Sequence, residues 1–374
     1  MAEISRRLLL RRFAALALGA IGSNTLAGCS LLATPTRPAT TDAVATSPTS
    51  EATLPTATLA PTPSPTFAPP PPKPEIIRFH PDVPSAVVHA RHAGVWQGDS
   101  LVPGALRQML DASIIALTGL ADARTAWAAL FRPEERIAIK VNAFQNSLVW
   151  THVPLVAALT DCLQDAGVAA EQIVIYDNLS RELKTAGFAV SQHGPGVRCY
   201  GSDFRHTAGF TVAGKPVVLS NVLLGCHALI NVPILKVHGM SGISFALKNH
   251  YGTVSAPADL HNPLNRAIAE LNALPEIRDR TRLVIGDALG ICLKGEGSWP
   301  YWREEKPGDS LFVGYDPVAV DTLGLGLFCQ ALLADAGTTG IAEVKAGGWL
   351  AAAAKLGIGT NDEKNMQVTG LALG

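Results

Sequence analysis

The sequence predicts an α/β domain built on a mainly parallel sheet with helices on both of its faces. Short, continuously apolar runs rich in β-branched residues, such as 136–142 and 172–177, alternate with a helical pattern over 153–166. Apolar strands that alternate with helices are typical of parallel sheets, because both faces of such sheets are covered. Polar residues follow directly after several of these runs. That position is where open α/β sheets bind their ligands.

Periodicity and turn residues give the order of the elements. Gly167 ends the first helical pattern, and Ala213-Gly214 is a turn signal between two strand-like runs. In chain order we expect a strand over 136–142, a helix over 153–166, a strand over 172–177, a helix that ends near Gly187, a hairpin over 210–219, and strands over 227–231, 282–286 and 311–314.

Upstream of this domain, residues 1–29 resemble an export signal that ends in a lipobox. Arg6 and Arg7 belong to a basic region, and the apolar stretch 13–27 leads to Cys29. The stretch is shorter than the roughly 20 apolar residues that cross a bilayer. The paired arginines are similar to the twin-arginine pattern of proteins exported in the folded state, and an ordinary export signal is the alternative. We therefore expect lipidation at Cys29 and a membrane anchor that faces outside the cytoplasm.

Residues 30–75 are predicted to be a disordered tether behind this anchor. From Thr34 to Pro74 the chain is almost entirely Pro, Thr, Ala and Ser, a composition that cannot bury enough apolar surface to offset the entropy of ordering. Proline-rich linkers extend by about 3.1 Å per residue, which suits a spacer; a proline-rich ligand for a partner domain is the alternative. The remainder, 76–374, is long enough for one large domain or two closely joined lobes.

Charge and cysteine content exclude several classes of function. A formal net charge of -1 with 16% charged residues gives no basic field for nucleic acid. Besides Cys29 there are five cysteines, widely spaced and without a Cys-x-x-Cys pair. This spacing indicates neither a disulfide framework nor a zinc or iron–sulfur site. We expect buried free thiols, with one or two disulfides as the alternative in an exported protein, and no iron–sulfur cluster.

Polar residues gather at the carboxyl ends of the predicted strands. These ends share one edge of a parallel sheet, so residues far apart in sequence can converge there on a ligand. The aspartates among them are candidate ligands for a divalent cation, although each also suits a helix or turn cap. The group consists of Lys140, Asn142, Asp177, Asn231, Lys236, His238, Asp287 and Asp316, with Asp177, Asp287 and Asp316 as the candidate metal ligands.

The densest group of candidate residues lies in the stretch 231–252. Its glycines and serine at 239–242 predict a flexible loop ahead of a helix over 243–250, and a helix N-terminus binds anions. Clustered lysines can have a lowered pKa and act as a base or nucleophile. Histidine suits acid/base chemistry or metal ligation, with a structural hydrogen bond as the alternative. The candidate catalytic residues are Lys140, His238 and Lys248, and the candidate substrate-binding residues are Asn142, Asn231, Lys236, Ser241, Gly242 and Asn249.

This stretch resembles the DUF362 family, whose members carry an Asn-Val-Pro-x-Leu-Lys-x-His run and then an Ala-Leu-Lys-Asn helix. Here the runs occupy 231–238 and 246–249, and the segments 139–142, 175–177 and 316–321 match further family stretches in the same order. The resemblance implies little about activity, because the family is named for lacking an assigned function. Many of its members carry ferredoxin-like cysteine motifs that this sequence lacks, so their iron–sulfur role is not expected here.

The segment 289–309 is a second candidate element, because it combines a Gly-Glu-Gly run with Trp299, Tyr301 and Trp302. Long loops of this kind are often lids over a ligand; packing of the insertion onto the domain is the alternative. Together these features predict an exported, lipid-anchored enzyme that acts on a small anionic or carbonyl-bearing substrate. The alternative is a non-catalytic solute-binding lipoprotein that uses the same cleft.

Overall fold

The computed structural model describes residues 83–144, 149–203, 205–294, 304–337 and 340–374. The predicted export signal with Cys29, the whole predicted tether and residues 76–82 of the predicted domain lie outside them. The described residues belong to one compact unit. Its main sheet contains β1 (Ser85–His92), β4 (Ile137–Val141), β5 (Ile173–Tyr176), β6 (Arg198–Cys199), β9 (Ala228–Val232), β10 (Ile234–His238), β11 (Gly242–Ser244), β12 (Thr281–Lys294), β13 (Glu304–Gly314) and β14 (Met366–Leu373).

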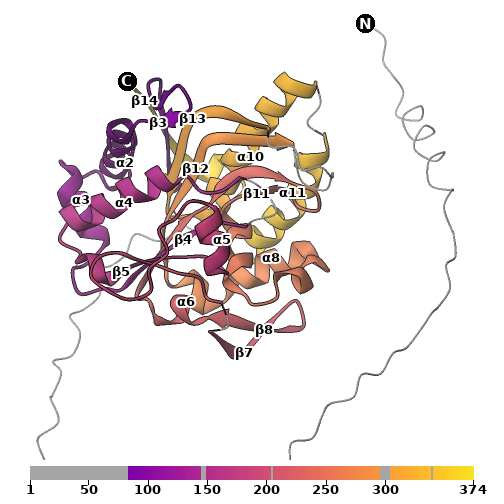
Figure 1. The fold of residues 1–374 in the computed structure, drawn as a ribbon. Helices are drawn as coiled ribbons and strands as arrows, with labels where there is room; N and C mark the ends of the chain where they lie inside the picture. Colours follow the sequence, from indigo (N-terminus) through magenta and orange to yellow (C-terminus); the bar gives the residue numbers. More distant parts are fainter. Residues whose placement is uncertain (1–82, 145–148, 204, 295–303, 338–339) are drawn as a thin grey trace, which may run out of the picture. The chain divides into compact units, whose positions relative to one another are not determined.

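This ten-stranded sheet has the order β14-β1-β13-β12-β9-β4-β5-β6, with β10 paired to β12 and β11 paired to β10 (Figure 1). The neighbours from β12 through β9, β4 and β5 to β6 are all parallel. β13 runs antiparallel to both β1 and β12, and β11 runs antiparallel to β10. The predicted α/β class with a mainly parallel sheet is therefore confirmed.

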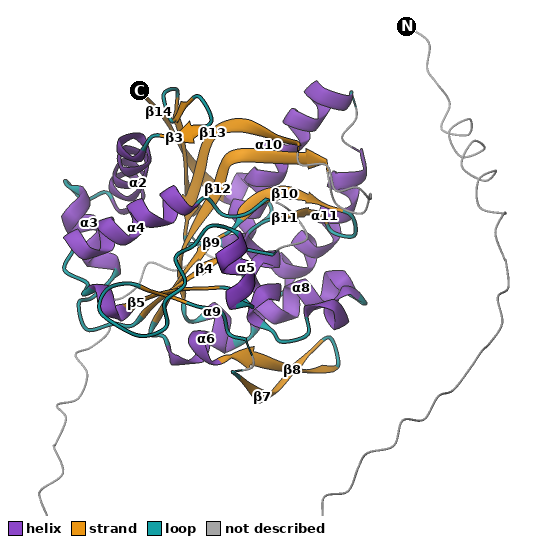
Figure 2. Cartoon of the chain, in the orientation of Figure 1, coloured by secondary structure: helices purple, strands orange, loops and turns teal. Residues whose placement is uncertain are grey.

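Helices cover both faces of this sheet (Figure 2). The helices are α2 (Pro103–Thr118), α3 (Ala123–Leu130), α4 (Val153–Asp165), α5 (Ser180–Thr185), α6 (Asn221–Gly225), α7 (Ala246–Asn249), α8 (Leu264–Ala273), α9 (Pro275–Arg278), α10 (Pro317–Ala336) and α11 (Gly340–Lys355). Two further pairs of strands stand apart, β2 (Trp96–Gln97) with β3 (Ser100–Leu101), and β7 (His206–Val212) with β8 (Lys215–Ser220).

Alternate side chains of β4 belong to two different core clusters, one on each face of the sheet. Ile137, Ile139 and Val141 belong to the core cluster shared with α2, α3 and α4. Ala138 belongs to the other cluster, which includes α8, α10 and α11. Because successive side chains of a strand point to opposite faces, Lys140 lies on the same face as Ala138. A lysine inside an apolar strand therefore points away from the first core and toward α7.

Local sequence signals account for the ends of several elements. The hairpin of β7 and β8 turns at Ala213-Gly214, where both residues have positive φ, 53° and 78°, so the predicted turn is confirmed. α10 begins with the Asp316 carboxylate accepting from the N–H groups of Val318 and Ala319. A proline follows this cap at the first helical position, where its missing N–H costs nothing.

Two expectations for residues 227–250 are wrong in detail. Lys236 and His238 do not follow a strand but lie within β10, which begins directly after Pro233 interrupts the chain beyond β9. The expected helix over 243–250 is reduced to α7, because residues 242–244 form β11 and pair with β10. Gly242 turns the chain at a φ of 83°, and a Cβ there would lie 2.4 Å from the Ala342 carbonyl oxygen.

The expected lid over 289–309 is largely sheet where the structure describes it. β12 continues to Lys294 and β13 begins at Glu304, so both arms of the segment are paired strands. Residues 295–303, with all three aromatic residues of the prediction, lie outside the described residues.

α10 is apolar and long enough over Pro317–Asp335 to cross a membrane by length and composition. In the described domain, however, Val318, Val320 and Phe328 of this helix lie in the core cluster of one sheet face.

Candidate functional site

A cavity of about 480 Å³ lies where the carboxyl ends of β4 and β5 meet β10, α5 and α7. We call it the cleft. Four cationic and two acidic residues line it together with two histidines, so positive charge exceeds negative charge by two when the histidines are neutral. These residues are Lys140, Arg181, Lys236, Lys248, Asp177, Glu182, His238 and His261.

Lys140 and Asp177 form a buried ion pair at the floor of the cleft. Lys140 Nζ lies 2.7 Å from Asp177 Oδ1, and the two side chains are 0% and 4% exposed. The ammonium also donates to the Val141 carbonyl oxygen at 2.7 Å. Burial lowers the pKa of Lys140, and the opposite charge of Asp177 partly offsets that effect. The carboxylate in turn accepts from the N–H groups of Ala143 and Asn178, at 2.6 and 2.8 Å.

Gly252 packs directly against this pair. A Cβ at that position would lie 2.1 Å from Asp177 Oδ1 and 2.7 Å from Lys140 Nζ. Glycine is therefore required here by the close approach of the backbone to the two charges.

An amide network joins the ion pair to Lys236. Asn249 Oδ1 accepts from Lys140 Nζ at 3.4 Å and from Asn142 Nδ2 at 3.2 Å. Asn142 Oδ1 in turn accepts from Lys236 Nζ at 2.7 Å. Beneath the cleft, Asn231 accepts from Asn249 Nδ2 at 2.7 Å and donates to the Ala246 carbonyl oxygen. Networks of this kind hold side chains in one arrangement, because each buried polar atom needs its partner.

His238 is held in one tautomer by its own loop. Its Nδ1 accepts from the N–H groups of Met240 and Ser241, both at 3.2 Å. Burial, reinforced by the charges of Lys248 and other neighbours, lowers the pKa of His238 to about 2. The neutral ring therefore carries its proton on Nε2, where it acts as a hydrogen-bond donor.

His261 stacks on His238 with ring centroids 5.6 Å apart and planes inclined by 16°. Its Nδ1 lies 3.1 Å from the Pro257 carbonyl oxygen, and its Nε2 lies 3.5 Å from Lys248 Nζ. A nitrogen that faces a carbonyl oxygen carries the proton, so Nε2 is the acceptor. Burial and the charge of Lys248 lower the pKa of His261 and keep the ring neutral.

Lys248 reaches the cleft from α7. Its ammonium lies 3.9 Å from the centroid of the Tyr251 ring, in the geometry of a cation–π contact. The residue is 6% exposed. A neutral imidazole and an aromatic face thus surround this cation on two sides.

Asp321 fixes the short helix that carries Lys248 and Asn249. Its carboxyl oxygens accept from the N–H groups of Ala246 and Leu247 at 2.5 and 2.9 Å. Complete burial raises the pKa of Asp321 to about 8. A four-residue helix has little stability of its own, so this contact from α10 determines where α7 lies.

The three aspartates predicted as metal ligands do not come together. Asp177 pairs with Lys140, and Asp287 bonds to His152 Nδ1 at 2.8 Å and to the His152 N–H at 2.9 Å. Asp316 caps α10 and accepts from Ser85 Oγ at 2.5 Å. Within the described ranges, no group of three metal-ligating side chains is present. The predicted cation site is therefore wrong for this set of residues.

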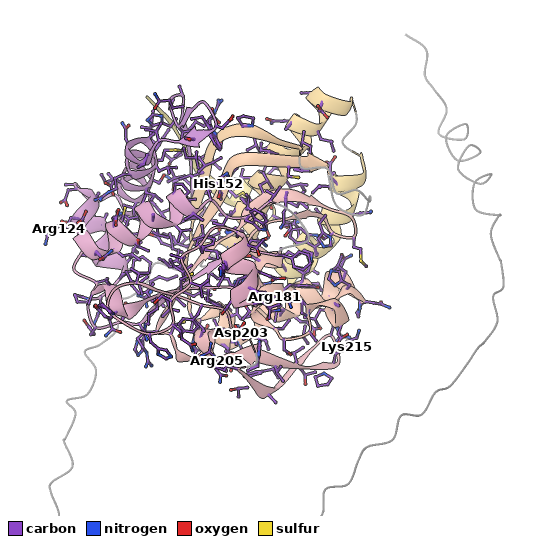
Figure 3. All side chains as sticks on the ribbon, in the orientation of Figure 1. Arg124, His152, Arg181, Asp203, Arg205 and Lys215 are labelled. Atoms are coloured by element: carbon purple, nitrogen blue, oxygen red, sulfur yellow. The ribbon has the colours of Figure 1, made fainter. Side chains whose placement is uncertain are left out.

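Asp287 and Lys140 are separated by the sheet. Leu283 and Ile285 point to the face of the sheet that α4 covers. Alternate side chains of a strand share one face, so Asp287 points to this face as well. Its partner His152 comes directly before α4. Figure 3 labels His152 beside α4, apart from Arg181, which α5 contributes to the cleft. The expected meeting of the cleft lysines with Asp287 or Asp316 does not occur.

The structure otherwise brings most of the predicted site residues together. Ser241 and Gly242 are exceptions, because Ser241 Oγ donates to the Ile243 carbonyl oxygen and Gly242 packs on α11. Asn231 lies beneath the cleft as a support. His261, Tyr251 and Arg181 were not predicted. The predicted residues that line the cleft are Lys140, Asn142, Asp177, Lys236, His238, Lys248 and Asn249.

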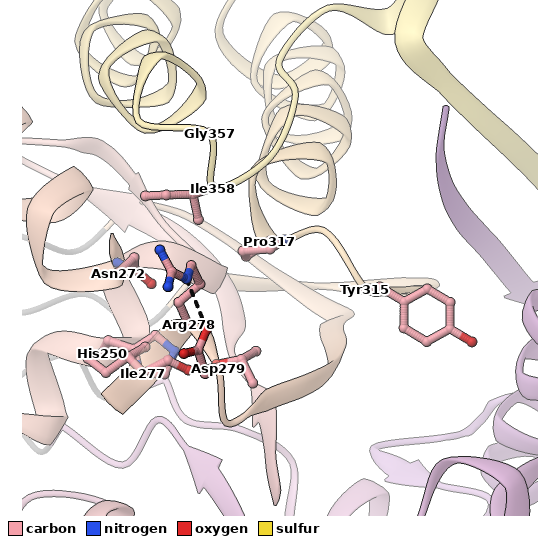
Figure 4. Close-up of a pocket in the computed structure, with 10 residues that line it drawn as sticks. His250, Asn272, Ile277, Arg278, Asp279, Tyr315, Pro317, Gly357 and Ile358 are labelled. Carbon is pink, nitrogen blue, oxygen red and sulfur yellow. Dashed lines mark hydrogen bonds and ion pairs between the residues drawn. The ribbon is translucent and has the colours of Figure 1, made fainter. Parts of the chain in front are cut away.

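A second cavity of about 320 Å³ is lined by residues of α8 and α9 and by the start of α10 (Figure 4). His250, Asn272 and Arg278 contribute to its lining. Burial lowers the pKa of His250 to about 3, and Arg278 is paired with its neighbour Asp279 at 3.0 Å. The cleft has the larger set of converging charged groups and is the better candidate site.

No disulfide joins the five cysteines of the described residues, in agreement with the expectation of thiols rather than disulfides. Four are buried, and Cys329 is half-buried.

Comparison with known proteins identifies one family model, described as a domain of unknown function (DUF362), which matches residues 137–326, just over half of the chain. No curated protein matches the sequence. Similar solved structures include a Thermotoga maritima protein, with 13% identity and a TM-score of 0.40, covering 63% of this chain and 60% of that one. Another is the lactate racemase apoprotein of Thermoanaerobacterium thermosaccharolyticum, with 10% identity and a TM-score of 0.32, covering 55% of this chain and 50% of that one. The chain thus spans less than two thirds of either protein.

Proposed function

The chain belongs to the DUF362 family, and from the cleft built by its matched region we propose that it is an enzyme acting on a small anionic or carbonyl-bearing substrate. The observation that carries the proposal is the convergence of Lys236, Lys248, His238 and His261 on one cavity. An excess of positive charge in a partly closed site attracts and holds an anion. The two neutral imidazoles supply one hydrogen-bond donor and one acceptor beside it.

The arrangement of the lysines supports binding of a small molecule. Lys140 pairs with Asp177, and Lys236 donates to the Asn142 amide oxygen and to the Val149 carbonyl oxygen. Lys236 thus brings a positive charge to the cleft wall, where such a charge attracts an anionic ligand. Phe144 and Leu179 add apolar surface to the lining, which suits an organic anion better than a bare inorganic one.

We further propose that the protein works outside the cytoplasm, anchored to the membrane through lipidated Cys29 and spaced from it by the tether of residues 30–75. The sequence of the export signal supports this location.

A non-catalytic solute-binding protein is the second candidate, and one observation favours it. His238 is fixed as a neutral donor by two backbone N–H groups, and a fixed donor serves capture as well as it serves chemistry. Turnover separates the two functions, because only an enzyme changes the bound molecule.

Isothermal titration of the purified full-length protein with small carboxylates, 2-oxo acids and phosphate esters tests the proposal. We expect one anion class to bind, with the affinity at least about tenfold weaker in Lys236→Met and in Lys248→Met. Lys355→Met is the matched control, because Lys355 is exposed at the end of α11 and should leave the affinity unchanged.

Mass spectrometry of the ligand after prolonged incubation then decides between enzyme and binding protein. A changed ligand supports the enzyme, and an unchanged ligand supports capture. Equal affinity in all three variants would contradict a role of the cleft in either function.

A further inference from the structure

We propose that Lys248 is a nucleophile that forms an imine with a substrate carrying a carbonyl next to an anionic group, and that His261 carries the proton in this step. The inference rests on the proposed function and narrows it to one substrate class, 2-oxo acids and related carbonyl anions.

The position of Lys248 is the first argument. The residue lines the cleft, is 6% exposed, and holds its ammonium 3.9 Å from the Tyr251 ring centroid. A lysine acts as a nucleophile when it is desolvated and lies near other cations, because both conditions favour the neutral amine. Lys236 lines the same cavity.

His261 is the second argument, because it can take up a proton at the right atom. Its Nδ1–H points to the carbonyl oxygens of Pro257 and Ala258, at 3.1 and 3.3 Å. The lone pair of Nε2 is thereby directed to Lys248 Nζ, 3.5 Å away. Nucleophile, base and a group that orients the base are the three parts of an activated nucleophile.

The other two lysines of the cleft are held differently. Lys140 Nζ lies 2.7 Å from a carboxylate oxygen of Asp177, which favours the charged form. Lys236 Nζ lies 2.7 Å from Asn142 Oδ1, an acceptor that cannot take up its proton. Lys248 Nζ lies 3.5 Å from an imidazole nitrogen, a group that can take up its proton.

The step balances without a further reagent. The Lys248 ammonium gives one proton to His261 Nε2, and the resulting amine attacks the carbonyl carbon to form a C–N bond. The carbonyl oxygen receives two protons in all, the one carried by His261 and a second one from the nitrogen, and leaves as water. Ammonium and carbonyl thus become a protonated imine and water. The imine withdraws electrons from the adjacent carbon bonds of the substrate, as in enzymes that use lysine for this purpose.

The remaining groups of the cleft suit the anionic end of such a substrate. Lys236 supplies a charge, and His238 supplies an Nε2–H donor whose orientation is fixed by its loop. A carboxylate beside the carbonyl would be held by these two groups while the carbonyl carbon faces Lys248.

Reductive trapping tests the inference. The full-length protein is incubated with glyoxylate, pyruvate or 2-oxoglutarate and sodium cyanoborohydride, and the modified lysine is located by peptide mass spectrometry. We expect a single adduct on Lys248, its loss in Lys248→Arg, and a trapping rate at least about tenfold lower in His261→Phe. Lys355→Arg should trap as the parent protein does.

Titration with pyruvate and with propionate, which lacks the carbonyl, separates the possible failures. Binding of pyruvate to the cleft without a Lys248 adduct would overturn the imine while leaving the proposed function in place. Adducts spread evenly over exposed lysines would overturn it in the same way. Absence of binding by every anion of the panel would overturn both.

Discussion

Removal of the Asp177 charge, in Asp177→Asn, should destabilise the whole domain. The substitution keeps the size of the side chain and one oxygen acceptor, but leaves the Lys140 ammonium without its carboxylate in a site where the lysine side chain is 0% exposed. Breaking a buried pair by removing one partner costs about 3–5 kcal/mol. One of the two N–H groups that Asp177 accepts from, at Ala143 or Asn178, would also face an amide NH₂ group.

The matched comparison is a double-mutant cycle with Lys140→Met. Lys140→Met alone leaves Asp177 with its two N–H donors, so its cost should be smaller than that of Asp177→Asn. The double variant removes both charges, and we expect it to recover about 1–3 kcal/mol relative to the sum of the single variants.

Urea unfolding followed by circular dichroism at neutral pH measures these free energies. The pH dependence adds a second test, because burial lowers the pKa of Lys140 in the folded protein. In Asp177→Asn the unfolded chain then binds more protons than the folded chain. Stability of that variant should therefore rise with pH up to the ordinary lysine pKa of about 10.4. A coupling energy near zero, or a variant as stable as the parent, would refute the account of the ion pair.

Four further predictions concern other residues. Asp321→Ala removes the acceptor of two N–H groups at the start of α7, and we expect a loss of about 0.5–2 kcal/mol in urea unfolding and weaker anion binding in calorimetry; unchanged affinity would show that α7 does not depend on this cap. Gly252→Ala should lower the melting temperature, because the added Cβ meets the buried ion pair, and equal melting temperatures would speak against that contact. The stability that neutral His238 contributes is complete above pH 6.5 and is lost as pH falls toward about 2, because the unfolded chain takes up the proton first; His238→Asn should flatten this slope in an acid series of unfolding curves. Cys29→Ala should move the protein from the membrane to the soluble fraction on centrifugation, and membrane association of this variant would exclude lipidation as the anchor.

The sequence allowed the central strands to be predicted well, because β4 and β5 are buried on both faces and read as continuous apolar runs. Lys140 was predicted to be a site residue because it comes at the carboxyl end of the first of these runs. The carboxyl ends of parallel strands share one edge of the sheet, where ligands bind.

The errors arose where the outcome depended on which face of the sheet a side chain takes. Asp287 and Lys140 both lie near one edge of the sheet, but their side chains point to opposite faces. A sequence shows which residues of one strand share a face, but it does not show which residues of two different strands do so until the register between the strands is known. β10 was not predicted as a strand, because Pro233 on one side of it and Gly239 and Gly242 on the other are residues typical of loops.

His261 was missed because nothing in the spacing between it and His238 brings the two together. The ring enters the cleft from the turn 257–261, whose path depends on packing against Tyr251. Asp316 was predicted to be a metal ligand, whereas its carboxylate caps α10. Asp321 of the same segment accepts from the first N–H groups of α7 and so supports the cleft.

The contact between Asp321 and α7 has a consequence for the order of events during folding. The two partners are 75 residues apart in sequence, and closing a chain segment of that length is slow compared with forming a local helix. We therefore expect α7 to acquire its position only after α10 has docked onto the sheet. Lys248 and Asn249 would then reach the cleft at a late stage, and ligand binding would report the completion of folding rather than an early intermediate.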